Sequence, residues 1–262
     1  MAFTTIDDPS AYFQVALHSS ANAATVTNDG NSDLQPDLIW SKARTATHNH
    51  GLYDSTRGVT KFLSSNATST ETTASAGYDL TSFNTDGFST GNNQFNTICG
   101  GTTYVGWQWK ANGGTTASNT DGSITSTVQA NQDAGFSIVT YTGNGTDGAT
   151  VGHGLGAVPA MVLFKCRDTS NTDWRIYHQS ISPTNALSLN SAGAQYGASG
   201  VFGGTFTSTL LKVENDTGAN RNTSPMIAYC FAEKQGYSKF GKYVGNGNSN
   251  GPFVYTGFKP AF

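Results

Sequence analysis

The sequence predicts an all-β protein built from antiparallel sheets. The 262-residue chain contains 31 glycines and only 12% charged residues, so it has many turn formers and few strong helix formers. Its 15 Phe, 11 Tyr and 4 Trp supply large apolar anchors that disordered chains rarely carry. No window has the periodicity of a convincing amphipathic helix. We therefore expect a folded β protein with a sizeable core.

Several blocks have the composition or alternation of strands. Residues 36–44 (PDLIWSKAR) and 159–167 (PAMVLFKCR) begin apolar and then alternate, with Lys and Arg on one face. Residues 104–110 alternate Tyr, Gly and Gln with Val and Trp, and residues 123–130 and 136–143 are rich in β-branched and aromatic side chains. Each block is short enough for a single strand.

Turn signals separate these blocks. Asn-Gly and Asp-Gly pairs favour the tight turns of hairpins. They begin at Asp86, Asn112, Asp121, Asn144, Asp147, Asn246 and Asn250. Short strands joined by such turns predict an antiparallel sandwich or barrel.

The strand blocks recur, which predicts an internal duplication. Residues 13–18 match 136–141 and residues 36–44 match 159–167, both at an offset of 123. Residues 52–54 and 63–66 find counterparts 124 positions later, and residues 104–110 find one 122 positions later. Five blocks in order with so little drift indicate tandem units or pseudo-symmetric halves. The predicted fold is thus a pair of antiparallel β-sandwich units of jelly-roll or concanavalin-like type.

A third, partial copy sets the expected domain boundaries. YTGNG at residues 141–145 recurs as YVGNG at 243–247, and residues 153–161 resemble 254–262. We expect a first unit at residues 1–115, a Thr/Ser/Asn/Gly-rich connector at 116–134, and a second unit at 135–262 that ends in a closing strand. The alternatives are that the first unit borrows a strand from the second, or that the halves form one sandwich.

Charge and cysteine content exclude several classes of protein. The net charge is −3 with no basic run, which predicts neither nucleic-acid binding nor attraction to an anionic membrane. No apolar stretch approaches the roughly 18 residues of a membrane span, and the N-terminus lacks a signal-peptide pattern. Cys166 and Cys230 lie in apolar runs and are expected to be small buried residues in a reducing cytoplasm.

The densest polar cluster is THNHGLYDSTRG at residues 47–58. His48 and His50 would share one face of a strand, where two imidazoles can bind a metal with Asp54 as a third ligand. The second copy lacks the histidine pair, which favours a polar loop and no metal. Contacts to a ligand or partner are assigned to seven residues, with low weight. They are Lys42, His48, His50, Tyr53, Asp54, Arg57 and Lys165.

Other candidate chemistry is weak, so we expect no cofactor and no enzymatic activity. Residues 143–148 and 245–251 resemble calcium loops. However, the first loop has a single carboxylate, Asp147, and the second loop has none. His153 lies between glycines without a G-x-S-x-G nucleophile elbow, so a turn position is expected. No carboxylate pair for glycoside hydrolysis can be nominated, and H-E-x-x-H, P-loop and C-x-x-C patterns are absent from the sequence.

Aromatic and basic residues kept in both halves have structural and functional interpretations. Trp107 and Trp109 share the apolar face of their strand and align with aromatic residues of the second half, which favours core packing over sugar binding. Lys42 and Arg44 align with Lys165 and Arg167. These pairs are expected either in ion pairs at the surface or between sheets, or in contacts to a neighbouring subunit.

The blocks PDLIWSKAR, HGLYDSTRG, FLSSNATSTET and TYVGWQWKA, followed by GFSIVTYTGNG and TVGHGLGAVPAMVLFK, resemble a repeat of tailed-phage structural proteins, notably those of marine and cyanobacterial phages. The resemblance covers nearly the whole chain and implies a virion component made in the host cytoplasm. It carries over no functional residues. The second copy has lost the D-S-x-R-G of residues 54–58, so that stretch serves one half only.

The resemblance leaves three functions open, because one fold hosts many activities. The first is a tail or fibre protein with possible recognition of a host-surface glycan. The second is a decoration protein that clamps the capsid lattice, and the third is a glycan-degrading enzyme. The expected partners are other virion proteins and further copies of this chain in a homotrimer, with neither nucleic acid nor membrane insertion.

Overall fold

The computed structural model describes residues 4–197 and 199–260. Within these residues, nineteen strands form four antiparallel sheets, and the 3-10 turn η1 (Pro9–Ala11) is the one helix. The described chain therefore has no helix long and apolar enough to cross a membrane. The all-β prediction is confirmed, and the fold is sandwich-like.

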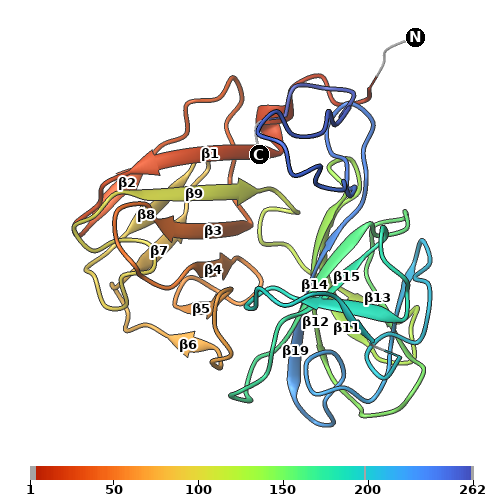
Figure 1. Cartoon of the computed structure of the whole chain (residues 1–262). Helices are drawn as coiled ribbons and strands as arrows, with labels where there is room; N and C mark the ends of the chain where they lie inside the picture. Colours follow the sequence, from red (N-terminus) through yellow and green to blue (C-terminus); the bar gives the residue numbers. More distant parts are fainter. Residues whose placement is uncertain (1–3, 198, 261–262) are drawn as a thin grey trace.

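The N-terminal half contains a six-stranded sheet and a three-stranded sheet (Figure 1). The six strands lie in the order β1 (Phe13–His18), β9 (Tyr104–Trp109), β3 (Leu38–Ala43), β4 (Gly51–Asp54), β5 (Lys61–Ser64) and β6 (Thr72–Thr73). The smaller sheet has the order β2 (Ala24–Val26), β8 (Phe88–Thr90) and β7 (Leu80–Phe83). The bounds of β1, β3 and β9 agree with the blocks predicted to be strands.

The C-terminal half contains an eight-stranded sheet and a two-stranded sheet. The eight strands lie in the order β10 (Ala117–Asn119), β11 (Ser126–Asn131), β12 (Phe136–Thr142), β19 (Pro225–Phe231), β14 (Met161–Cys166), β15 (Arg175–His178), β16 (Asn185–Ser188) and β17 (Tyr196–Gly197). The smaller sheet pairs β13 (Ala149–Gly152) with β18 (Leu210–Val213). Residues 116–134, expected to be a connector, thus contribute β10 and β11 to the large sheet.

Alternation along each strand divides the apolar side chains among three buried clusters. In β3, Ile39 belongs to the core of the N-terminal half, whereas Leu38 belongs to a cluster between the two large sheets. In β14, Phe164 points into the core of the C-terminal half and Leu163 into the same middle cluster. The molecule is therefore layered, with the two large sheets at its centre.

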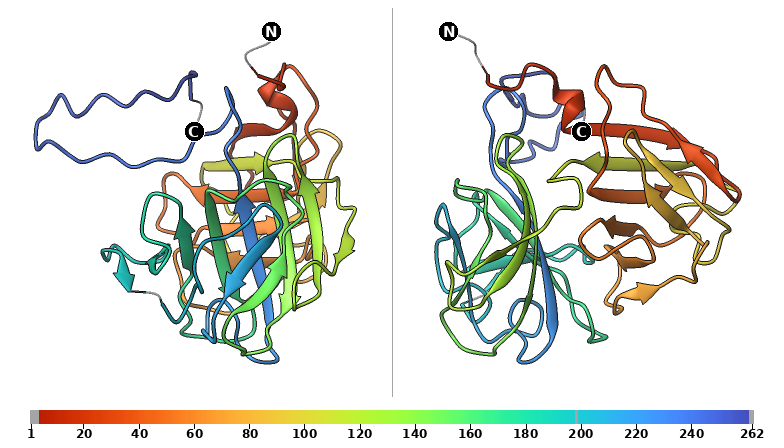
Figure 2. Two further views of the ribbon diagram at one scale, coloured as in Figure 1. Left: turned by 90° about the vertical axis from the view of Figure 1, so that its right-hand side faces the viewer. Right: turned by 180° about the vertical axis from the view of Figure 1, so that it is seen from behind.

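The middle cluster makes the two halves one packed body. Phe136, Leu163 and Ile227 are at most 2% exposed there, and they pack with Leu38 and Leu52 of the N-terminal half. Burial of each such side chain is worth roughly 1.5–3 kcal/mol. Figure 2 shows the large sheets meeting with their strands in crossing directions. The two halves therefore share a buried apolar cluster in addition to the separate core of each half.

The C-terminal stretch differs from the prediction. After β19, residues 232–260 form no strand and contain one isolated bridge, between Lys234 and Ser238. The predicted closing strand is therefore not seen in the described part of this stretch; Ala261 and Phe262 of the predicted block lie outside it. The physical reason is local pairing: in the described part of this stretch, the backbone hydrogen bonds from Lys234 on, such as those between Lys234 and Ser238 and between Gly251 and Asn248, stay within the stretch and join no edge strand.

Candidate functional site

The D-S-x-R-G stretch forms a closed, buried turn. Asp54 ends β4, and its Oδ1 accepts the backbone N–H of Arg57 at 2.9 Å. The Arg57 side chain folds back, so that Nε donates to Asp54 Oδ2 at 2.5 Å and Nη2 donates to the carbonyl of Leu52 at 2.9 Å. Asp54 is 0% exposed and Arg57 is 8% exposed, so neither side chain presents its charge to solvent.

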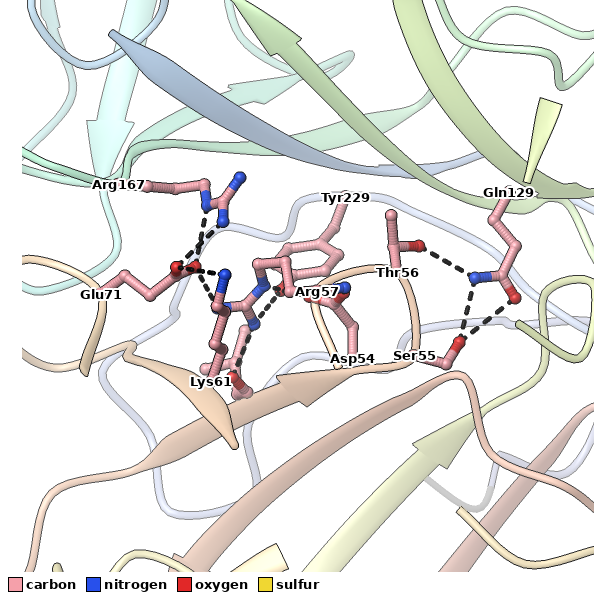
Figure 3. Close-up of polar contacts among 10 residues, drawn as sticks. Asp54, Ser55, Thr56, Arg57, Lys61, Glu71, Gln129, Arg167 and Tyr229 are labelled. Carbon is pink, nitrogen blue, oxygen red and sulfur yellow. Dashed lines mark hydrogen bonds and ion pairs between the residues drawn. The ribbon is translucent and has the colours of Figure 1, made fainter. Parts of the chain in front are cut away.

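This turn is joined to the C-terminal half by a network of polar contacts (Figure 3). The Tyr229 hydroxyl, from β19, donates to Asp54 Oδ2 at 2.6 Å and accepts from Arg57 Nη2 at 3.0 Å. Arg57 Nη1 lies 3.1 Å from Glu71 Oε2. Arg167, from the C-terminal half, binds the same carboxylate: its Nε donates to Glu71 Oε2 at 2.8 Å and its Nη2 donates to Glu71 Oε1 at 2.9 Å. The half-exposed Lys61 Nζ lies 4.0 Å from Glu71 Oε1, so the two carboxylates are matched by two arginines, with a lysine at the edge of the cluster.

The electrostatics keep this cluster ionised. Desolvation disfavours the charge on Arg57, but Asp54, Tyr229 and Glu71 raise the Arg57 pKa above its ordinary value. Desolvation also opposes the charge on Glu71, but hydrogen bonds and charge from Arg167 and Arg57 bring its pKa below the ordinary value. Burial raises the Tyr229 pKa well above 10.0. Asp54 and Arg57, expected to contact a ligand or partner, are therefore engaged inside the protein.

A second polar network fixes the chain between the halves. Asp37 is 0% exposed and accepts the backbone N–H groups of Ala111, Gly113 and Gly114 at 2.7–2.9 Å. Ser55 Oγ donates to Asp37 Oδ1 at 2.6 Å and links it to Gln129 of β11. Sequence reasoning missed Asp37, although a carboxylate directly before a buried strand was the available signal.

Tyr53 and Lys165, also expected at a contact site, are buried. Tyr53 is 0% exposed and its hydroxyl lies 2.5 Å from Thr97 Oγ1 in the N-terminal core. Lys165 is 0% exposed; its Nζ donates to the carbonyl of Thr172 and lies 6.0 Å from the ring centre of Trp174. Burial lowers the Lys165 pKa to about 8. Neither residue is on the surface of the chain.

The remaining predicted residues lie at the surface. His48 and His50 are partly buried, and the backbone N–H of His50 donates to Asn66 Oδ1 at 3.0 Å. Burial, with the nearby charge of Lys42, lowers the His50 pKa. Lys42 Nζ donates to the carbonyl of Ala43 at 3.0 Å. No group of three or more His, Cys, Asp or Glu side chains placed to hold a metal occurs in residues 4–197 and 199–260.

The loops considered for calcium and catalysis use their polar atoms internally. Asp147 Oδ1 accepts the backbone N–H of Asn215 at 2.8 Å, and Asn144 Oδ1 accepts that of Thr146 at 2.9 Å. His153 is 0% exposed and directly follows β13, where its Nδ1 accepts the N–H of Leu155 at 3.3 Å and its Nε2 lies 3.2 Å from the carbonyl oxygen of Thr207. The turn position predicted for His153 is not seen, because no turn is assigned at this residue.

The tryptophans expected in the core and the arginines expected in ion pairs agree with those expectations in part. Trp109 is 9% exposed, and Trp107 packs against the middle cluster. Arg167 forms the predicted ion pair between sheets, through Glu71, whereas Arg44 is exposed. The cysteines expected to be buried, Cys166 and Cys230, are both 0% exposed.

A cavity lies between the halves, and we call it the aromatic groove. Its volume is about 380 Å³, within the range of ligand pockets. Its floor is formed by Phe13, Trp40, Trp109, Phe136, Met161 and Phe231. Residues 236–240, Thr256 and residues 258–260 form the wall. Among the described residues, the charged side chains that line it are Lys239 and Lys259, and no Asp or Glu side chain does so.

The chain between the two wall segments projects from the body, and we call residues 243–255 the C-terminal arm (Figure 2). Its apolar side chains are exposed: Tyr243 by 70%, Val244 by 84%, Phe253 by 91%, Val254 by 52% and Tyr255 by 72%. The tip is shaped by Asn246 and Asn248, whose side chains accept N–H groups two residues on at 3.0 and 3.1 Å. The sequence predicted turns at Asn246 and Asn250 in this segment, but it gave no sign that the flanking apolar side chains would be exposed.

The fold and these features define an all-β, sandwich-like protein with an internal ionic network, an aromatic groove and an apolar arm. Residues 8–262 match the family described as a domain of unknown function, DUF7483. The chain therefore belongs to the DUF7483 family. No curated protein and no solved structure matches it.

Proposed function

We propose that this protein is a non-enzymatic structural component of a phage virion, associated with the tail or its fibres. The resemblance of its sequence blocks to repeats of tailed-phage structural proteins supports the virion assignment. The observation that carries the structural role is the C-terminal arm, whose most exposed apolar side chain, Phe253, is 91% exposed. Contiguous exposed apolar surface of this kind is typical of contacts between proteins.

The positions of the ionisable groups support a role without catalysis. Catalytic acids, bases and nucleophiles need access to a substrate in a cleft. Here Asp54 and Glu71 are paired with Arg57 and Arg167 between the halves, and Lys165 is enclosed beside Trp174. Among the described residues, no Asp or Glu lines the aromatic groove, which disfavours a glycan-degrading site there.

We also propose that the two halves derive from duplication of one jelly-roll-like unit. Strand order supports this origin: β1-β9-β3-β4-β5-β6 in one sheet corresponds to β12-β19-β14-β15-β16-β17 in the other. The correspondence agrees with the sequence offsets of 122–124 residues. The D-S-x-R-G turn belongs to the first copy alone because a single turn suffices to join the two sheets.

Recognition of a host-surface glycan is the additional activity that a fibre position would favour. Trp40 is a partly exposed aromatic face in the groove on which a sugar ring can stack. Sugar hydroxyls also need hydrogen-bond partners, and the uncharged polar side chains of the groove are those of Ser238, Thr256 and Tyr237. We therefore rank glycan binding behind assembly with other proteins.

Cryo-electron microscopy of the phage particle that carries this chain tests the proposal. Density for the chain at the tail or fibres is the expected result, and glycan arrays with purified protein would then test the host-recognition part. Density over the capsid lattice would overturn the tail assignment and favour a decoration protein. Absence of the chain from purified particles would overturn the virion assignment altogether.

A further inference from the structure

The aromatic groove and the C-terminal arm share their base. Residues 236–240, Thr256 and residues 258–260 line the groove, and the arm is the chain between these two wall segments. Figure 2 shows the arm extending away from the body, and no residue of the arm is among those that line the groove. Every copy of the chain therefore carries one apolar projection and one apolar recess.

The arm has the chemistry of a segment that is normally covered. Residues 243–255, YVGNGNSNGPFVY, contain no Asp, Glu, Lys, Arg or His. Its two legs form no strand within the described residues, and the Tyr255 carbonyl at the base of the arm accepts a hydrogen bond from Lys239 at 3.4 Å. The apolar side chains of the legs, among them Tyr243 and Phe253, are 52–91% exposed.

A segment with nearly the same sequence as the start of the arm is buried elsewhere in the chain. Residues 141–145 read YTGNG and residues 243–247 read YVGNG. Tyr141 is 6% exposed and donates to the carbonyl of Ala219 at 2.5 Å, and the N–H of Gly143 donates to the carbonyl of Ser224 at 2.9 Å. Tyr243, at the corresponding place in the arm, is 70% exposed.

We infer that the arm of one copy binds in the aromatic groove of a second copy. The groove presents aromatic faces, and the arm presents uncharged aromatic and aliphatic side chains. The charged residues that line the groove, Lys239 and Lys259, are exposed and can keep their ammonium groups in solvent, so the contact does not require burial of a charge. The exchange closes reciprocally in a dimer or head to tail in a trimer, because each copy contributes one donor and one acceptor. The inference goes beyond the proposed function and does not depend on the location of the chain in a virion.

Light scattering coupled to size-exclusion chromatography tests the contact. The intact chain is expected to be a dimer or trimer. Replacement of Tyr243, Val244, Phe253, Val254 and Tyr255 by Ser is expected to weaken association at least about 100-fold, as loss of central apolar anchors does. The matched control changes the polar tip, as Asn246→Ser with Asn250→Ser, and is expected to assemble normally. A monomeric intact chain, or an oligomer that survives the arm variant, would overturn the inference.

The groove variant is Met161→Arg, which places a charge in the recess, with Trp40→Ala as a second variant if the first does not fold. Either groove variant is expected to be monomeric. Mixing the arm variant with a groove variant restores one intact pair of arm and groove, so a one-to-one complex is expected. Failure of two folded variants to complement each other would contradict the arm-in-groove contact.

Disulfide trapping identifies which groove an arm enters. Phe253→Cys and Met161→Cys are made in separate chains, and the three native cysteines are buried and do not compete. Oxidation of the mixture is expected to produce a crosslinked heterodimer. If a chain carrying both changes instead forms an intrachain disulfide and stays monomeric, the arm folds onto its own groove and the inference is wrong.

Discussion

The hydroxyl of Tyr229 in β19 donates to Oδ2 of Asp54 at the end of β4, over 2.6 Å and across 175 residues of sequence. Arg57 Nη2 also donates to this hydroxyl, at 3.0 Å. Tyr229 therefore links the Asp54–Arg57 turn of the N-terminal half to a central strand of the large C-terminal sheet by hydrogen bonds. Tyr229 is 0% exposed. Water therefore cannot replace a hydrogen bond that a substitution of Tyr229 removes.

Tyr229→Phe is expected to lower the free energy of unfolding by about 1–2 kcal/mol. The change keeps the ring but removes the hydroxyl, which leaves Arg57 and Asp54 each with one contact fewer in a buried site. Urea denaturation measures the loss. Tyr78→Phe, at a ring that is 37% exposed, is the control and should stay within about 0.5 kcal/mol. Equal effects of the two changes would contradict a stabilising role for the Tyr229 hydroxyl.

Arg57→Met is expected to cost more, about 3–5 kcal/mol, because it leaves the carboxylates of Asp54 and Glu71 short of a cation in the interior. The double variant with Asp54→Asn should lose less than the sum of the two single losses, since it removes both charges together. The exposed Arg44→Met is the control. Additive losses in the double variant would show that the two residues act independently.

Regular strands were predictable from the sequence because their signal is local. The expected blocks at residues 13–18, 36–44, 104–110, 136–143 and 159–167 all contain the strands β1, β3, β9, β12 and β14. Alternation and β-branched composition are properties of short windows.

The candidate site was less predictable because it depends on long-range placement. The D-S-x-R-G turn was visible as a polar cluster, but its partner Tyr229 sits in an apolar block whose sequence gives no sign of Asp54. The predicted closing strand is not seen in residues 232–260 for a related reason. A segment joins a sheet only where it reaches a free edge strand, and the placement of the edge strands is a property of the whole sheet.

Glu71→Gln is expected to flatten the acid dependence of stability. The arginines hold the folded-state pKa of Glu71 below its ordinary 4.5, despite the desolvation that opposes this shift. The unfolded chain therefore binds the proton first, so this stabilisation is complete above pH 4.5 and declines as the pH falls through the lower folded pKa. At neutral pH the variant should lose about 1–3 kcal/mol, as expected for hydrogen bonds to a charged group.

Urea unfolding of Glu71→Gln at pH 7 and at successively lower pH measures both effects. Other carboxyls titrate in the same range, so the informative quantity is the difference between the variant and the wild type. That difference should shrink in acid. Asp133→Asn, at an exposed turn, is the control and should show no such convergence. A constant difference across the pH range would rule out a contribution from the Glu71 charge.

Burial of Lys165 is expected to make the free energy of unfolding depend on pH in the alkaline range. Burial lowers its folded-state pKa from 10.5 to about 8, so between these values the unfolded chain binds more protons and stability rises with pH. Linkage over this shift amounts to about 1 kcal/mol between pH 7 and pH 9.

Lys165→Met should abolish this rise in stability, while Lys42→Met, at the corresponding strand position in the other half, should keep it. Measurements stop at pH 9 because burial raises the pKa of Cys99 and Cys230 to about 12, whereas their unfolded thiols are already half ionised at pH 9.0. The informative quantity is therefore the difference between Lys165→Met and the wild type at each pH. If the wild type and Lys165→Met respond identically to pH, Lys165 does not titrate as its burial requires.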